Sequence, residues 1–504
     1  MPATQPQQPQ AVNDRIDCNG WLGGSYQARS LAADAERTIN LYLEYNSPGE
    51  GKSRATLYST PGLNVFSTMP STGFNQGIYS CSIDSAQHVF CVTGSTLFEI
   101  YADGTSVSRG TVSINQPVHW ADDGLGNVAL ATGNAFYIYN LSSGVLTQIS
   151  TVNGTPIIAS DTTFIDGYFF VLITDTNYVY SSEPNQPLVW NDLSFTVKEG
   201  QSDHAVGLGT DHLQLWIMGS ATIEVWYNAG NPIGFPFSRV QGGFVQHGLV
   251  APSTVVQMED GLFWLGGDSN GAVRVFRNSG YSAIRISTHA LEAAINGYSN
   301  IADSTASSYL QEGHNFFRLD FPSANGGNGA TWVYDTATQL WHERLYWNLL
   351  SSVWQCNPAR YMCYAYGLYL GAHYSSNIIY TQSLDAATDA GNPIRRQRTG
   401  SPLADHMNWN QFHEFQLDMQ MGIGVPLTGQ GSSPLATLRF SDDGGYTWSN
   451  DIVTQLGMVG QTKARAMWRR LGKSRDRVYE VTITDPIQVA ILNAYIRVSP
   501  GSGA

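Results

Sequence analysis

The chain has 504 residues and a formal net charge of -14, and only 13% of its residues are charged. This length exceeds what one ordinary hydrophobic core supports, so we expect at least two domains, or one large propeller with an appended domain. The negative balance argues against a general nucleic-acid binder, because such proteins need a cationic face for phosphate. Any contact with DNA is therefore expected to be local or transient.

The start of the chain and its cysteines argue against further classes of protein. Residues 1–10 are rich in Pro and Gln and have no cationic start and no apolar run, so we expect no secretory signal. No stretch approaches the roughly 18 to 20 apolar residues that a membrane span needs. The cysteines are odd in number and form no CxxC, so neither a disulfide framework nor a zinc site is expected, and a reducing compartment fits best. They are Cys18, Cys81, Cys91, Cys356 and Cys363. We expect no metal and no cofactor.

Between about residues 57 and 380 the sequence repeats one pattern, in which short strands of alternating apolar residues are separated by Gly, Asn, Asp and Ser turns. This pattern predicts an all-β fold. Glycines in three joining turns, Gly94, Gly133 and Gly219, are available for positive φ. Units of four strands at blade-like length predict an irregular β-propeller of about five to seven blades. The clearest predicted strands are 88–93, 96–101, 127–131, 135–140, 168–173, 177–181, 213–218 and 222–227.

Helix is scarce in the sequence. Residues 289–296 predict one short helix with Thr288 as its N-cap, and residues 28–37 are a second candidate. Residues 489–498 follow an Asp-Pro pair that can start a helix, but they can equally form a closing strand. Residues 267–271 match the GxSxG pattern of a serine nucleophile. That motif requires a following helix, whereas a strand is predicted at 272–277, which favours a plain hairpin.

Composition shifts after residue 380, where residues 385–402 are rich in Ala, Thr, Asp, Gly and Pro. We therefore predict a propeller over residues 57–384 and a C-terminal β domain over residues 385–504. Residues 1–56 are expected to form an N-terminal arm and first strands that pack on the C-terminal domain. A small β-sandwich is favoured for that domain by its predicted strands. They are 412–423, 435–441, 447–452, 464–470 and 478–484.

The C-terminal domain contains one complete Asp-box hairpin. In such a hairpin the acidic side chain accepts backbone N–H groups, a glycine takes positive φ, and a tryptophan packs under the turn. The Asp box is a folding device, and in sialidases it lies away from the chemistry, so it predicts structure and not catalysis. Its residues are Ser441, Asp443, Gly445, Thr447 and Trp448.

A basic segment follows the Asp box, with seven cations and one anion, Asp476, between residues 463 and 477. Alternation around Trp468 places arginines on one face of a strand and apolar residues on the other. The charged face is either simply solvated or an interface, where arginine forks bind carboxylates, with DNA phosphate as a further candidate. Together with the basic run at 395–398, the candidate docking interface comprises Arg395, Arg396, Arg398, Lys463, Arg465, Arg469, Arg470, Lys473, Arg475 and Arg477.

No catalytic set can be picked out of the sequence. The 11 histidines show neither HExxH nor HxH spacing and no paired carboxylates. A sialidase needs an arginine triad and a Tyr/Glu pair, and no such set is recognisable. We therefore expect that the protein is not an enzyme.

Short segments in three parts of the chain occur in a characteristic order. They lie at residues 37–42, 52–55 and 58–63, then at 223–228, 235–237, 261–266 and 285–288, and finally at the Asp box, 468–472 and 475–478. Together they resemble the packaged-DNA stabilisation proteins of short-tailed bacteriophages, also described as tail hub, nozzle or head-completion proteins. None of the segments is a catalytic motif, and their specificity lies in their combination and order.

The resemblance implies a structural virion protein of the phage tail, synthesised in the host cytoplasm. It implies a hexameric ring below the portal and its adaptor ring, which closes the DNA-filled head and continues the ejection channel. The implied partners are further copies of the chain, the adaptor and portal ring, tail spikes, fibres or a needle, and genomic DNA during its passage. The 13 Trp, 26 Tyr and 20 Phe leave a carbohydrate-binding or carbohydrate-cleaving tail fibre or spike as the alternative. A host-encoded propeller scaffold is a third candidate.

Overall fold

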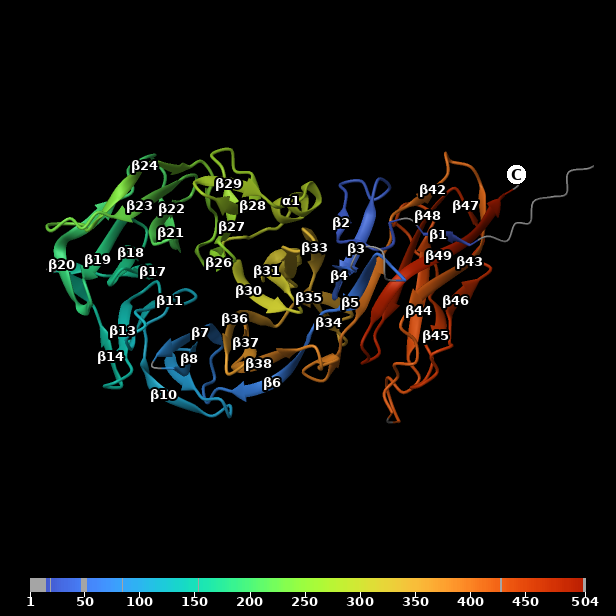
Figure 1. Ribbon diagram of the computed structural model, residues 1–504, viewed down its shortest axis with the longest axis horizontal. Helices are drawn as coiled ribbons and strands as arrows, with labels where there is room; N and C mark the ends of the chain where they lie inside the picture. The colour runs from blue at the N-terminus through green and yellow to red at the C-terminus, as the bar shows by residue number, and fades with distance from the viewer. Residues whose placement is uncertain are drawn as a thin grey trace, which may run out of the picture. The chain divides into compact units, whose positions relative to one another are not determined.

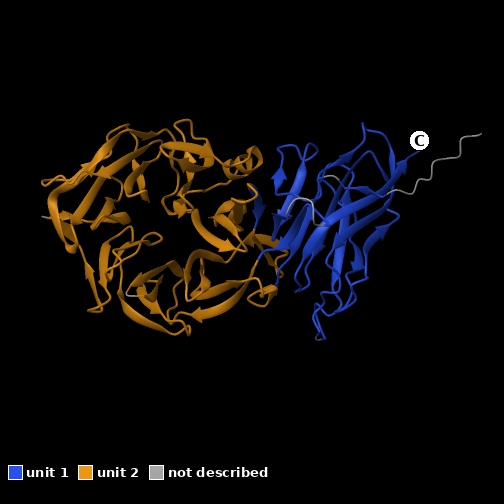
Figure 2. Ribbon diagram, in the orientation of Figure 1, with its two compact units in different colours: residues 1–60, 340–343, 393–504 blue, residues 61–339, 344–392 orange. Residues whose placement is uncertain are grey.

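The computed structural model of the protein describes residues 15–501, except residues 19, 47–51, 84, 153 and 427. The Pro/Gln-rich start at residues 1–10 lies outside the described residues. The chain forms two compact units (Figure 2): unit 1 is residues 1–60, 340–343 and 393–504, and unit 2 is residues 61–339 and 344–392. The domain boundaries predicted from the sequence lie between residues 56 and 57 and between residues 384 and 385.

Unit 2 is a β-propeller, whose antiparallel sheets follow one another around a common centre (Figure 1). Its first four blades have four strands each, and consecutive strands pair. The blades are β7 to β10 (Asn75–Ile83, Ala86–Thr93, Thr96–Ile100, Ser106–Thr111), β11 to β14 (His119–Asp122, Asn127–Ala131, Phe136–Asn140, Val145–Gln148), β17 to β20 (Ala159–Ile165, Tyr168–Ile173, Tyr178–Glu183, Gln186–Val197) and β21 to β24 (Ala205–Asp211, Gln214–Gly219, Ile223–Asn228, Phe237–Val245).

The remaining blades are less regular. They are β25 to β29 (Gly248–Leu249, Val256–Met258, Gly261–Gly267, Val273–Ser279, Ser282–Arg285), then β30 to β32 (Thr305–Gln311, His314–Phe321, Ala330–Asp335), and β36 to β38 (Ala359–Ala365, Leu368–His373, Ile378–Ser383) joined by β6 (Gly62–Thr68). The number of blades lies within the expected range of five to seven. Short hairpins outside the blades are β15 with β16 (Thr151–Val152, Thr155–Pro156) and β34 with β35 (Leu345–Asn348, Val353–Cys356).

Strand β6 closes the propeller. It pairs antiparallel with β38, so that Gly62 lies opposite Ser383 and Thr68 opposite Ile378. The two ends of the unit thus complete one blade together, and the ring closes through backbone hydrogen bonds without a covalent link. Nearby, the buried Arg344 donates to the carbonyl oxygen of Pro61 at 2.8 Å and forms an ion pair with Asp389 at 2.6 Å.

The hydrophobic cores of the propeller lie between neighbouring blades. Phe90 of β8 meets Tyr139 of β13 edge to face, with 5.5 Å between the ring centroids. The last blade packs on the first in the same way, because Leu370 and Ile379 share a buried cluster with Val89. Each blade is therefore held by its two neighbours. Deleting a buried aromatic ring in such an interface costs about 3 to 5 kcal/mol.

The sequence located most propeller strands within one or two residues, and two of the three turn glycines behave as predicted. Gly94 and Gly133 have φ values of 59° and 79°. The prediction was wrong for Gly219, whose φ is not positive. A Cβ at Gly219 would instead collide with the side chains of Lys198 and Asp203, which form a buried ion pair above it.

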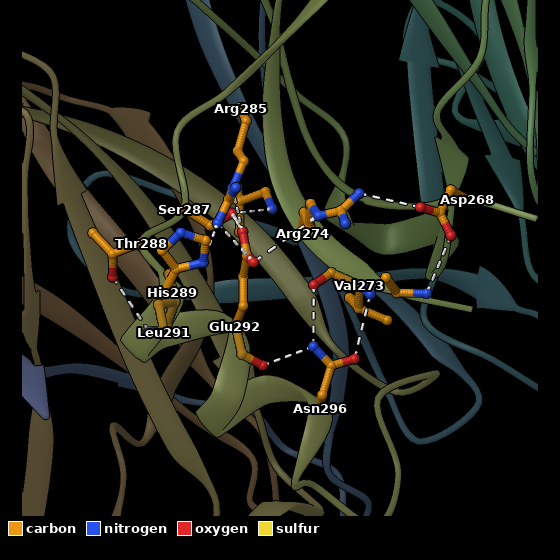
Figure 3. A network of polar contacts seen from close by, with 12 residues as sticks. Asp268, Val273, Arg274, Arg285, Ser287, Thr288, His289, Leu291, Glu292 and Asn296 are labelled. Atoms are coloured by element: carbon orange, nitrogen blue, oxygen red, sulfur yellow. Dashed lines mark hydrogen bonds and ion pairs between the residues drawn. The ribbon is translucent and has the colours of Figure 1, made fainter. Parts of the chain in front are cut away.

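Helix α1 (His289–Asn296) begins and ends where the sequence predicts, and the hydroxyl of Thr288 accepts the N–H of Leu291 at 3.3 Å. Glu292 of this helix is the centre of a polar network (Figure 3). Its carboxylate accepts two bonds from Arg285, at 2.5 and 2.8 Å, and one from the hydroxyl of Ser287 at 2.6 Å. The network attaches helix α1 to strand β29, which precedes it.

The GxSxG match is a hairpin turn between β27 and β28, as the sequence favours. Asp268 accepts the backbone N–H groups of Asn270 and Ala272. It also pairs with Arg274 at 3.1 Å (Figure 3). Because a strand follows the turn, Ser269 does not have the setting of a nucleophile elbow.

Unit 1 is a β-sandwich of two sheets. One sheet has the order β4, β5, β49, β43, β46 (Leu41–Tyr45, Ala55–Ser59, Ala490–Pro500, Asn410–Met419, Ala466–Arg469), with β1 (Ile16–Asp17) on β49 and β47 (Lys473–Ser474) on β43. In the other sheet, the strands of unit 1 are β33, β3, β41, β48, β44, β45 (Leu340–Glu343, Ala35–Ile39, Arg396–Thr399, Asp476–Ile483, Leu435–Ser441, Ile452–Gln455), with β2 (Tyr26–Gln27) on β3 and β42 (Leu403–Ala404) on β48.

Aromatic residues from both sheets fill the sandwich core. Phe415 lies 5.1 Å from Trp21, 4.6 Å from Tyr479 and 5.8 Å from Trp468, measured between ring centroids. Residues 490–498 belong to strand β49, and Val489 directly precedes it, so the closing strand and not the helix is the correct one of the two alternatives that the sequence left open. The predicted helix at 28–37 is wrong, because these residues form the turn between β2 and β3 and most of β3 itself. The strand predicted at 447–452 begins only at Ile452.

Closure of the ring predicts that Gly62→Ala destabilises unit 2. A Cβ there would collide with the carbonyl oxygens of Ala386 and Thr388, and backbone in a paired region cannot move away cheaply. We expect a loss of about 1 to 3 kcal/mol in urea unfolding, the usual cost of overpacking. Asn64→Ala on the exposed side of the same strand is the control, with a change within about 0.5 kcal/mol. Equal stability of the two variants would contradict this account of closure.

Candidate docking interface

The structure divides the ten predicted docking cations into three groups. Arg396, Arg398 and Arg477 are buried, and Arg395 is half-buried. The others are exposed on unit 1: Lys463, Arg465, Arg469, Arg470, Lys473 and Arg475. The sequence prediction therefore needs correction for the three buried arginines, which cannot present their guanidinium groups to a partner.

Arg398 on β41 connects the N-terminal segment of unit 1 to the sandwich. Its guanidinium donates to the carbonyl oxygens of Trp21, Gly24 and Gly20 at 2.6, 2.9 and 2.8 Å, and it lies 3.4 Å from the carboxylate of Glu36. Residues 20–24 form no strand, so their carbonyl groups need other partners. Arg398 supplies these hydrogen bonds. Burial lowers its pKa, and Glu36 partly offsets this effect.

Arg477 on β48 is enclosed by aromatic rings. Its guanidinium carbon lies 4.1 Å from the ring centroid of Phe440 and 4.5 Å from that of Phe412. It pairs with Asp442 at 2.6 Å and donates to the carbonyl oxygen of Leu471 at 2.7 Å. These contacts satisfy the charge inside the unit. Arg477 therefore stabilises the interior of the sandwich next to the Asp box.

The other buried arginine of the basic run, Arg396, donates to the carbonyl oxygens of Ile394 and Asp485, at 3.3 and 3.2 Å. Burial lowers the pKa of its neighbour Arg395, which is only half-buried. The second basic run thus contributes to the interior of unit 1 and not to an exposed patch.

The exposed cations follow strand β46 and the chain after it. Ala466 and Trp468 point into the core, whereas Arg469 is exposed, as the alternation predicts. Arg470 has a φ of 63° and starts the turn that leads to β47. Arg475 lies over the ring of the exposed Trp409, with 4.7 Å between its guanidinium carbon and the ring centroid. We call this exposed set the cation row: Lys463, Arg465, Arg469, Arg470, Lys473 and Arg475.

A buried carboxylate pairs with one member of the cation row. Glu414 on β43 pairs with Arg469 at 3.1 Å and with Arg15 at 2.7 Å, and Arg497 lies opposite it on β49. Although burial acts to raise it, the pKa of Glu414 is lowered by the hydrogen bonds from Arg15 and Arg469. Three arginines around one carboxylate leave a local excess of positive charge. The sequence prediction missed Arg15, Glu414 and Arg497, because they come from three distant segments.

The Asp box has the hydrogen bonds that the sequence predicts. Asp443 accepts the backbone N–H groups of Tyr446 and Thr447, at 3.0 and 2.9 Å, and the hydroxyl of Ser441 at 2.6 Å. Gly445 has a φ of 102°, and Trp448 lies beneath it and under the guanidinium of Arg439, 4.6 Å from the ring centroid. The hydrogen bonds lower the pKa of Asp443 to about 2.

A propeller followed by a β-sandwich defines the protein as a two-part, all-β protein. Models of the family of bacteriophage P22 Gp10 match it twice, the β-propeller over residues 33–385 and the β-sandwich over residues 395–499. The chain therefore belongs to the P22 Gp10 family of DNA-stabilisation and tail hub proteins of short-tailed phages. It is a structural phage protein and a component of the virion. Both the family and the fold class expected from the sequence are confirmed.

No curated protein sequence matches the chain. Similar solved structures include the extracellular domain of the one component system BT4673 from B. thetaiotaomicron, with 11% identity over 79% of this chain and 48% of that chain and a TM-score of 0.42. A mitotic checkpoint complex chain has 13% identity over 67% and 93%, with a TM-score of 0.39. Virginiamycin B lyase from Staphylococcus aureus has 12% identity over 63% and 97%, with a TM-score of 0.41. The chain spans about half the length of the first, and these low scores carry no functional argument.

Two features absent from the described part of the chain bear on other kinds of site. No group of three or more His, Cys, Asp or Glu among these residues could hold a metal ion. None of their helices is long and apolar enough to cross a membrane.

The buried position of Arg398 predicts that Arg398→Met destabilises unit 1. The substitution keeps much of the side-chain volume but leaves carbonyl groups and Glu36 without their partner. We expect a loss of about 3 to 5 kcal/mol, typical of a broken buried ion pair, in denaturant unfolding followed by tryptophan fluorescence. The same substitution at the exposed Arg465 should change stability by less than about 0.5 kcal/mol. Similar effects at both positions would show that burial does not distinguish the two groups of arginines.

The lowered pKa of Asp443 predicts a specific pH dependence. A carboxyl group whose folded pKa is below its unfolded value, about 3.9, stabilises the fold above that value and loses this effect as the pH falls through about 2. The melting temperature of Asp443→Asn should therefore be lower than that of the unchanged protein at pH 5, and the difference should shrink towards pH 2. A difference that stays constant over this range would rule out ionised Asp443 as the cause.

Proposed function

We propose that the protein forms a ring-shaped hub in the tail of a short-tailed phage, below the portal and adaptor ring. In this position it would close the DNA-filled head and later form part of the ejection channel. The two family matches, in order and over most of the chain, are the observation that carries the proposal. A hexamer is the ring order that the resemblance implies.

The cation row is the proposed docking surface towards an acidic neighbour in the virion. Its side chains are exposed, and it continues into the cluster of Arg15, Arg469 and Arg497 around Glu414. Arginine forks bind carboxylates through two parallel hydrogen bonds, which favours a protein partner with Asp and Glu side chains. The remainder of the chain is acidic on balance, since the formal charge of the whole is -14. A wall with few cations would let DNA pass without strong binding.

The proposed mechanism is mechanical. Closure by β6 makes unit 2 a stiff ring of blades, and the buried Arg398 and Arg477 brace unit 1 from inside. A stiff subunit can transmit the load of packaged DNA to its neighbours through fixed contacts. No chemical step is needed for this role.

The test is electron microscopy of the purified protein, alone and mixed with its portal and adaptor complex. We expect closed rings on the portal and adaptor complex, and class averages will give the ring order. Particles that remain single under both conditions would overturn the proposal.

Charge reversal on the cation row predicts a defect in docking. In a phage carrying Arg465→Glu and Lys473→Glu, we expect filled heads that bind less of this protein and lose DNA, measured by nuclease sensitivity. The matched control carries Arg29→Glu and Arg277→Glu, which change the charge equally at exposed positions away from the row. Heads that remain sealed with the row reversed, or that leak equally with the control, would contradict the proposed docking surface.

A further inference from the structure

A cavity of about 330 Å³ lies at the centre of the propeller. The innermost strand of every blade contributes to its wall, through residues such as Tyr79, Asp161, Leu208, Thr305 and Tyr361. The wall combines apolar and polar side chains, and its exposed surface is more polar than apolar. Two further polar residues of this wall, His119 and Ser253, form a chain of hydrogen bonds with Asp161.

The three side chains are connected in one order. The Nε2 atom of His119 lies 3.0 Å from the hydroxyl oxygen of Ser253, and its Nδ1 atom lies 2.9 Å from Oδ1 of Asp161. A nucleophile bonded to a base, which is in turn oriented by a carboxylate, is the pattern of activated serine hydrolases. Both distances fall within the range that such chemistry requires.

Separate elements hold each member in place. His119 is the first residue of β11, Asp161 lies on β17, and Ser253 lies on the short 3-10 helix η1 (Pro252–Thr254). The second oxygen of Asp161 accepts the backbone N–H of Leu208 at 2.7 Å. Its carboxylate is 4% exposed, so its direction is fixed by these bonds. The packed ring of blades therefore fixes the relative positions of these three side chains.

Ser253 lines two hollows of the propeller. Its side chain is half-buried, and it borders both the central cavity and a second hollow of about 460 Å³, which also includes Pro117, Pro252 and Tyr361. A serine that only completed the hydrogen bonding of a buried histidine would not need this access. The position fits a nucleophile that meets a ligand in the cavity.

We propose that Ser253, His119 and Asp161 form a serine-hydrolase site that cleaves small esters with a short, uncharged acyl group. The size of the cavity sets the limit on the acyl group. Its lining residues include Asp161 but no lysine or arginine, so it offers no partner for an anionic substrate. This inference is independent of the structural role in the tail.

The reaction follows from the positions of the atoms. The Ser253 hydroxyl oxygen attacks the ester carbonyl carbon and transfers its proton to Nε2 of His119. When the carbon–oxygen bond to the alcohol breaks, the alcohol leaves with that proton, and the acyl group remains on Ser253. A water molecule then attacks the acyl carbon, with His119 again taking and returning the proton. The carboxylic acid is released and Ser253 is restored.

Asp161 acts as a positioning residue, through His119. Burial acts to lower the pKa of His119, but the carboxylate of Asp161 outweighs it and the pKa is raised. The same interaction would stabilise the imidazolium that forms when His119 holds the serine proton.

The experiment uses the full chain and two probes, a fluorophosphonate that phosphonylates activated serines and p-nitrophenyl acetate as a small ester. We expect the fluorophosphonate on Ser253, located by peptide mass spectrometry, and hydrolysis of the ester above the rate in buffer. Ser253→Ala and His119→Gln should lower hydrolysis at least about 100-fold. Asp161→Asn should lower the rate and also shift the midpoint of its pH profile downwards, because His119 loses the carboxylate.

The matched control is His314→Gln, which breaks a histidine–carboxylate pair with Asp335 on another blade, outside the lining of the cavity. It should keep both labelling and hydrolysis. Circular dichroism and melting temperature establish that each variant is folded. The proposal would be overturned if the fluorophosphonate did not label Ser253 in the protein without substitutions. It would also be overturned if folded Ser253→Ala still hydrolysed the ester. Both outcomes count whether or not the other variants fold.

Discussion

Closure of the propeller by β6 determines how both units of the chain are built. A ring completed by its own first strand brings the two ends of unit 2 into one blade, where Gly62 lies opposite Ser383 and Leu63 opposite Asp389. The chain therefore enters unit 2 at residue 61 and leaves it at residue 392 next to the same blade. This explains how residues 15–60 and 393–501, which are far apart in sequence, supply strands to the same two sheets of unit 1.

Local patterns were sufficient to predict most of the secondary structure. Alternating apolar residues identified the propeller strands, and Thr288 identified the start of α1, because both signals act over a few residues. The failures have a physical reason. Residues 28–37 contain helix-forming residues, but β3 pairs with β41, a partner more than three hundred residues away, as with Arg37 opposite Thr399. Tertiary pairing overrides propensity there.

The arginines illustrate a similar limit at the candidate site. A guanidinium group can serve a partner at the surface or unpaired carbonyl groups in the interior, and the sequence does not distinguish these uses. Arg475 and Arg477 are two residues apart, yet one lies exposed over Trp409 and the other is enclosed between Phe412 and Phe440. The difference arises because β48 starts at Asp476, which turns Arg477 into the core. The start of that strand therefore decides which of these two arginines can reach a partner.

The central cavity contains the clearest feature that sequence motifs could not reveal. His119, Asp161 and Ser253 have no characteristic spacing, since each is contributed by a different part of the ring. A buried neutral imidazole needs one hydrogen-bond acceptor for its N–H group and one donor for its other nitrogen. Backbone groups of the inner strands could supply both. In this propeller the two partners are instead a fixed carboxylate and a serine hydroxyl that borders two hollows. The rigidity that suits the proposed role in the tail would also hold the proposed nucleophile and its base in position without reorganisation.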